Sequence, residues 1–124
     1  MNWNQACRLI VRNITPGLHL DPRWTYKIID TVPPYQCYRN EYNGISGFRV
    51  QVGAKSFIEV PLEVLREVHE YAILHNASSY SKGVFQYCFP NLYNQKPCYV
   101  HTVGKIFACA GVAHQVNNHS YQLL

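Results

Sequence analysis

The chain has 124 residues, of which 48% are hydrophobic and 15% charged, and its formal net charge is +4. This length and balance exclude an intrinsically disordered chain and predict a single domain, residues 1–124, that folds without disulfide or metal support. No apolar run is long enough to cross a bilayer, so we expect no membrane partner and a cytoplasmic location. The five cysteines are an odd number without regular spacing, which favours reduced thiols over disulfides.

The charges are unevenly distributed along the chain. Residues 1–70 contain all of the aspartates and glutamates, whereas residues 71–124 contain Lys82, Lys96 and Lys105 and no acidic residue. His101 and His119 lie in the same acid-free part. Its surface is therefore neutral or positive, which suits an anionic partner.

The first half of the chain predicts a helix followed by a small antiparallel sheet. Apolar residues recur at helical spacing over residues 2–13, and alternation predicts strands over 24–31, 48–52 and 56–60. The tyrosine-rich residues 35–42 are a further candidate strand. Asn43-Gly44 is typical of a hairpin turn, so the sheet has three to four strands.

The second half predicts three helices and a C-terminal hairpin. The helices cover residues 61–74, 81–89 and 97–111, and residues 92–96 are expected to form a loop. Residues 112–124 alternate around Asn117-Asn118, which suits a two-residue turn. The fold class is therefore α+β, and the hairpin either stands alone or joins the first sheet.

The helix over 97–111 is the element around which this half is organised. Pro97 and Gly111 mark its two ends, since proline is tolerated in a first helical turn and glycine adopts the left-handed cap. Its two sides differ in chemistry. We expect the apolar side to lie in the core; it carries Tyr99, Val100, Val103, Ile106, Phe107 and Ala110. We expect the other side to be exposed; it carries Cys98, His101, Thr102, Lys105 and Cys109.

The order helix, short helix, helix and hairpin over the last 64 residues resembles a winged-helix module. In that module the third helix enters the major groove of DNA and the hairpin contacts the backbone. The resemblance implies that His101, Thr102 and Lys105 face the groove and that residues 117–119 form the tip of the wing.

A second resemblance concerns residues 97–101, 104–107 and 110–111 of the same helix. These stretches are similar to small bacterial proteins carried on mobile elements, of the integron-cassette type. The resemblance implies no activity.

The leading hypothesis is a non-catalytic binding module, in its sharpest form a winged-helix-like binder of DNA or RNA. Phosphates or base edges would be contacted by Lys82, Lys96, His101, Thr102 and Lys105. The alternative is a module for a protein or small ligand, including a homodimer or other homo-oligomer. Its surface would use the tyrosines that precede and open the last helix, Tyr87, Tyr93 and Tyr99.

A third hypothesis is a thiol-dependent enzyme. Cys98 and His101 are one helical turn apart, and a cysteine in a first helical turn can be stabilised as its thiolate. A zinc site from Cys88, Cys98, His101, Cys109 and His114 lacks the closely spaced pairs that structural zinc sites use. We therefore assign no catalytic residue, metal ligand or cofactor.

Overall fold

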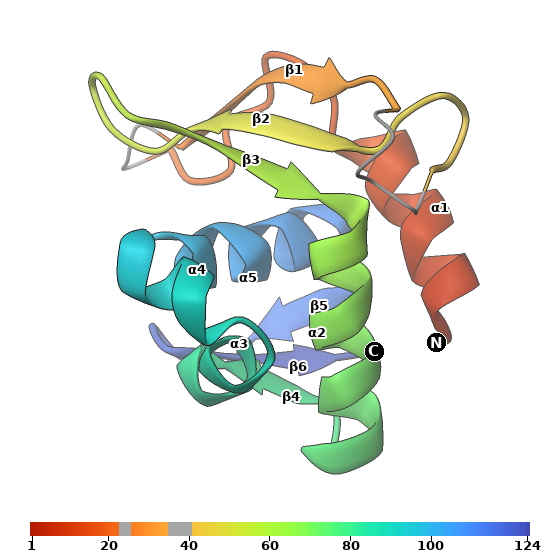
Figure 1. The fold of residues 1–124 in the computed structure, drawn as a ribbon. Helices are drawn as coiled ribbons and strands as arrows, with labels where there is room; N and C mark the ends of the chain where they lie inside the picture. The colour runs from red at the N-terminus through yellow and green to blue at the C-terminus, as the bar shows by residue number, and fades with distance from the viewer. Residues whose placement is uncertain (23–25, 35–40) are drawn as a thin grey trace.

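The structure, a computed structural model, describes residues 1–22, 26–34 and 41–124. Within these ranges the fold is α+β, with five helices and two antiparallel sheets of three strands each. Figure 1 shows the sheet of β1, β2 and β3 on one side of the helices α4 and α5, and the sheet of β4, β5 and β6 on the other. The predicted fold class is confirmed.

Helix α1 (Trp3–Asn13) confirms the predicted N-terminal helix. Its first turn is closed by a capping box, in which the side chain of Asn2 accepts from the backbone of Gln5 and the side chain of Gln5 accepts from the backbone of Asn2. Such reciprocal bonds satisfy amide groups that have no partner within a helix. The apolar side of α1 is buried, and Asn13 Nδ2 donates to the carbonyl of Ala110 at 2.9 Å.

The first sheet has the order β1-β2-β3, with β1 (Lys27–Val32), β2 (Gly47–Gln51) and β3 (Phe57–Pro61). Phe48 and Val50 are fully buried, as the alternation of this strand predicts. Asn43 and Gly44 both have positive φ, 52° and 76°, which confirms the predicted turn. The start of the predicted first strand and the candidate strand at 35–42 lie largely outside the described residues.

Helix α2 (Leu62–His75) follows β3 directly and confirms the predicted helix. Its buried side includes Val64, Leu65, Val68, His69 and Ala72.

After α2 the chain forms β4 (Ser79–Ser81), α3 (Lys82–Cys88), α4 (Pro90–Gln95) and α5 (Tyr99–Ala110). The predicted loop at 92–96 is wrong, because residues 90–95 are helical. Pro90 follows the end of α3 and occupies the first turn of α4, a position that suits its fixed φ. Gly111 has φ 82° and caps α5, as predicted.

The C-terminal hairpin consists of β5 (Ala113–Gln115) and β6 (Ser120–Leu123). It does not join the first sheet, because β6 pairs with β4 to give the order β4-β6-β5. The connection is longer than the predicted two-residue turn: Gln115 pairs with Tyr121, and the amide of His119 donates to Asn117 Oδ1 at 2.8 Å.

Helix α5 lies between the two sheets and joins them into one core. The Tyr80 hydroxyl of β4 donates to the carbonyl of Val100 at 2.8 Å, and the Tyr99 hydroxyl donates to the carbonyl of Glu59 in β3 at 2.9 Å. All six residues expected on the core side of α5 are buried.

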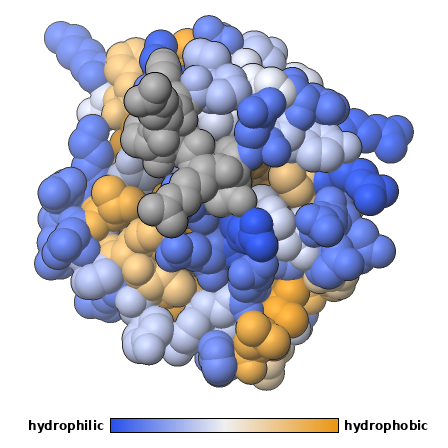
Figure 2. All heavy atoms as spheres, turned by 45° about the vertical axis from the view of Figure 1, so that its right-hand side comes forward, coloured by the Kyte–Doolittle hydropathy of each residue, from blue (hydrophilic) through white to orange (hydrophobic). Residues whose placement is uncertain are grey.

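On the face drawn in Figure 2, hydrophobic residues form small separate groups among hydrophilic ones. In the described ranges, every helix is too short or too polar to span a membrane.

Candidate ligand-binding site

The exposed side of α5 is narrower than the sequence predicts. His101 is exposed and Lys105 is partly buried, but Thr102 is fully buried and its hydroxyl donates to the carbonyl of Cys98 at 2.9 Å. The prediction that Thr102 faces outward is therefore wrong. The reason is that α5 is covered by elements from both halves of the chain, whereas the apolar pattern indicates only one buried face.

The two other predicted lysines lie in different places. Lys82 is the exposed first residue of α3, and its Nζ lies 5.4 Å from the centroid of the Tyr93 ring. Lys96, which follows α4, is also exposed, but its Nζ donates to the carbonyl of Phe57 at 3.1 Å. Only Lys82 lies beside the surface that α5 exposes.

The three predicted tyrosines do not form one surface. Tyr93 is half-buried and lines a pocket with Lys82 and His101. Tyr87 is exposed and stacks on Tyr71 of α2, with ring centroids 4.6 Å apart. Tyr99 is buried in the core, so it is not part of a ligand surface.

Two adjoining hollows run along the exposed side of α5, and we call them together the α5 groove. The first has a volume of about 500 Å³ and is lined by Asp21, Tyr26, His101, Lys105, Gln115, Asn118 and His119. The second has a volume of about 450 Å³ and is lined by Tyr26, Lys82, Tyr93, Pro97, Cys98, Val100, His101 and His119. Of the binding residues predicted from the sequence, the structure thus brings four together in this groove: Lys82, Tyr93, His101 and Lys105.

Lys105 is held in the groove by Asp21. Their Nζ and Oδ2 atoms are 2.9 Å apart, and the two side chains are only 14% and 10% exposed. The same Nζ lies 5.5 Å from the centroid of the Tyr26 ring. One of the predicted phosphate contacts is therefore already engaged in an ion pair within the protein.

Positive groups converge on His101. Burial lowers the pKa of His101, and the charges of Lys105 and His119 lower it further. His119 comes from the loop between β5 and β6, at the tip predicted from the winged-helix resemblance. A negatively charged ligand between these groups would relieve their mutual repulsion.

The thiol in the groove is not activated. Burial raises the pKa of Cys98, and the opposing effects of backbone N–H groups and of Lys96 are smaller. The backbone N–H groups at the start of α5 thus stabilise the Cys98 thiolate, as expected, but burial destabilises it by more. Cys98 lines the same hollow as His101, but it is a protonated thiol at neutral pH.

Within residues 1–22, 26–34 and 41–124, no three His, Cys, Asp or Glu side chains lie close enough together to hold a metal ion. Cys109, one of the zinc candidates, instead donates its Sγ hydrogen to the carbonyl of Leu20 at 3.4 Å.

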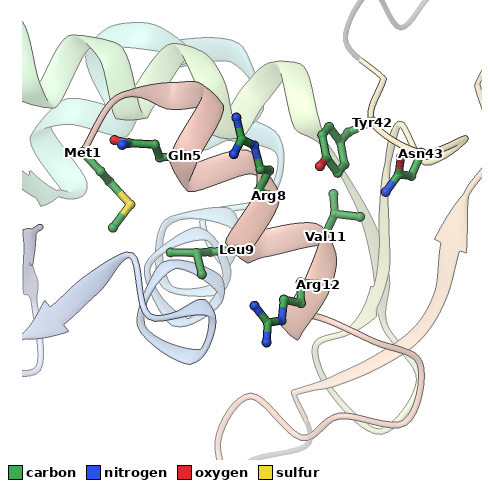
Figure 3. Close-up of a pocket in the computed structure, with 8 residues that line it drawn as sticks. All are labelled: Met1, Gln5, Arg8, Leu9, Val11, Arg12, Tyr42 and Asn43. Carbon is green, nitrogen blue, oxygen red and sulfur yellow. The ribbon is translucent and has the colours of Figure 1, made fainter.

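A larger hollow, of about 720 Å³, lies against the outer side of α1. Figure 3 shows that its two arginines, Arg8 and Arg12, point to different sides of the helix. The neighbouring Tyr42 lies beside Val11, away from Arg12. Because the charged groups diverge, this hollow is a weaker candidate for an anion site than the α5 groove.

Sequence reasoning did not find Asp21 and Tyr26 as groove residues. They lie in the irregular connection between α1 and β1, where the amide of Leu20 donates to the carbonyl of Tyr26 at 3.0 Å. This connection is about 80 residues away from α5 in sequence, as the 84-residue separation of Asp21 and Lys105 shows. No local signal in the sequence indicates that the two segments meet.

Comparison of the chain with family models, with curated proteins and with solved structures found no match. The resemblance of residues 97–111 to mobile-element proteins therefore stays a prediction.

Proposed function

We propose that this chain is a non-catalytic module that binds a small anionic ligand with an aromatic ring in the α5 groove. The observation that carries the proposal is that Lys82, His101, Lys105 and Tyr93, four residues singled out for binding, line two adjoining hollows. Basic side chains supply attraction for an anion. The half-buried rings of Tyr26 and Tyr93 supply a lining that suits a planar group.

The size of the groove favours a small ligand over a DNA duplex. Its hollows of about 500 and 450 Å³ are in the range of sites for small molecules. To read the major groove, a helix must project far enough to enter a cleft roughly 12 Å wide. The connection that carries Asp21 and Tyr26 lies against the exposed side of α5, so this helix projects little.

The proposal is tested by calorimetric titration of phenyl phosphate and adenosine monophosphate into the protein. Lys82→Ala and His101→Ala should each weaken binding about three- to tenfold, because each removes a positive group or donor from the groove. Lys96→Ala is the matched control, since this exposed lysine lies outside the groove, and it should change affinity by less than about twofold.

The pH dependence of binding is a second readout. The phosphate probes themselves take up a proton at about pH 6, so the readout is the affinity of the unmodified chain relative to that of His101→Ala. An anion next to His101 favours its protonated form, so this ratio should rise as the pH falls from about 7.5 to about 5.5. No binding of either compound at low salt would contradict the proposal.

Nucleic-acid binding is the second candidate, because the acid-free half contributes Lys82, His101 and His119 to one surface. Anisotropy of labelled duplex and single-stranded oligonucleotides distinguishes the two. Binding of duplex that is tighter than that of the mononucleotide and falls steeply with salt would favour the winged-helix interpretation.

A further inference from the structure

The hydroxyl group of Tyr121 is buried without a hydrogen-bond partner among the described residues. Tyr121 lies on β6 and is 2% exposed. Its ring packs directly on Gly104 of α5, where an added Cβ would lie 2.2 Å from the ring atom Cε2. A buried donor that lacks a partner costs roughly 1–3 kcal/mol, so its retention calls for an explanation.

The position of Tyr121 relates this hydroxyl to the α5 groove. The ring of Tyr121 covers Gly104, which directly precedes Lys105 in the chain. In the β5-β6 ladder, Tyr121 pairs with Gln115. Both Lys105 and Gln115 line the groove. Burial raises the pKa of Tyr121, and the charge of Asp21 raises it further, so the group remains a protonated hydroxyl that can donate a hydrogen bond.

Asp21 is the acidic group at this end of the groove. Its carboxylate lies 2.9 Å from Lys105 Nζ and is almost completely shielded from solvent. A carboxylate so placed has the charge and shape of the terminal group of an anionic ligand. Lys105 is only 14% exposed, which favours the free end of a small molecule over a phosphodiester within a duplex.

We propose that Asp21 holds the position of the ligand's terminal oxyanion, so that a bound carboxylate or phosphate monoester displaces Asp21 from Lys105 and accepts a hydrogen bond from Tyr121. This inference rests on the proposed function and narrows it to small molecules that end in such a group. Asp21 therefore competes with the ligand for Lys105, and removal of its carboxylate strengthens ligand binding.

The test uses two probes of matched shape, phenyl phosphate and benzoate, with phenol as the neutral control, titrated into the full chain by calorimetry. Asp21→Asn should bind the preferred oxyanion about tenfold tighter than the unmodified chain, because the competing carboxylate is gone. The relative affinities for the two probes show whether a phosphate or a carboxylate is preferred. Asp30→Asn, an exposed aspartate on β1, is the matched control and should leave affinity unchanged.

Tyr121→Phe is the second arm and keeps the inference testable if Asp21→Asn does not fold. It should weaken binding about tenfold while the melting temperature stays the same or rises, because the lost hydroxyl has no partner in the protein. Tyr80→Phe is its control: that hydroxyl is bonded to the carbonyl of Val100, so its loss should lower the melting temperature without changing affinity.

The outcomes separate this inference from the proposed function. If the unmodified chain binds a probe but neither Asp21→Asn nor Tyr121→Phe changes the affinity, the inference is overturned and the groove remains a binding site. If neither the unmodified chain nor Asp21→Asn binds phenyl phosphate or benzoate, both are overturned.

Discussion

His69 lies in the middle of the core, and neither of its ring nitrogens has a hydrogen-bond partner among the described residues. Its ring meets Trp3 of α1 and Phe107 of α5 edge to face, with centroids 5.8 and 6.0 Å away. Burial is the main reason why the pKa of His69 is lowered to about 4. The residue therefore packs as a neutral ring between three helices.

Acid should destabilise the protein through this residue. Below pH 6.5 the unfolded chain binds a proton at His69, whereas the folded chain does so only near pH 4, so the free energy of unfolding falls as the pH falls between these values. The loss should reach about 3 kcal/mol. Urea unfolding at a series of pH values measures it.

His69→Leu should flatten this part of the pH profile, because the group that binds the proton is removed. His75→Leu is the control on the same helix, since His75 is exposed. A profile for His69→Leu as steep as that of the unmodified chain would show that other groups cause the acid sensitivity.

At the scale of the element, α5 combines a helical sequence with a requirement for glycine in its interior. Glycine in a helix is less favourable than alanine by about 1 kcal/mol. At Gly104, however, an added Cβ would lie within 2.2 to 2.7 Å of three ring atoms of Tyr121. The buried ring cannot move away easily, so packing against β6 outweighs helix propensity here.

Gly104→Ala should therefore destabilise the protein by about 2 kcal/mol despite the better helix former. Gly83→Ala in α3 is the matched control, because the nearest atom to its added Cβ is 3.9 Å away, and it should be neutral or stabilising by up to about 1 kcal/mol. Thermal unfolding compares the two variants. Equal melting temperatures would contradict the close packing of Tyr121 on α5.

At the scale of the whole molecule, the two sheets are small but share one core. The buried apolar residues form one cluster that includes Val50 of β2 and Leu123 of β6. The hydrogen bonds of Tyr80 and Tyr99 tie α5 to both sheets. Because the two sheets share this cluster and are both bonded to α5, we expect one cooperative unit.

Val50→Ala and Leu123→Ala should each lower the melting temperature of the entire protein, by the equivalent of about 2 to 4 kcal/mol. Circular dichroism and tryptophan fluorescence should report the same single transition in each variant. Two transitions, of which one is unaffected by Val50→Ala, would show that the halves fold separately.

The local sequence pattern was sufficient to predict most of the helices and strands. Helical spacing predicted α1, α2, α3 and α5, and Asn43-Gly44 and Gly111 marked a turn and a helix end whose positive φ the structure confirms. These features depend on contacts between residues that are close in sequence. Two short elements were not predicted from the sequence. Strand β4 has only three residues, and helix α4 has six and begins at a proline directly after the end of α3.

The sequence by itself determined the α+β class, the buried side of α5 and the acid-free half that contributes Lys82, His101 and Lys105. Only the tertiary structure decided that Thr102 is buried and that Lys96 and Tyr87 lie away from the groove. It also decided that Asp21 reaches Lys105. The physical reason is that periodicity reports one buried face of a helix, whereas the second cover of α5 comes from segments far away in sequence, whose contacts leave no local pattern.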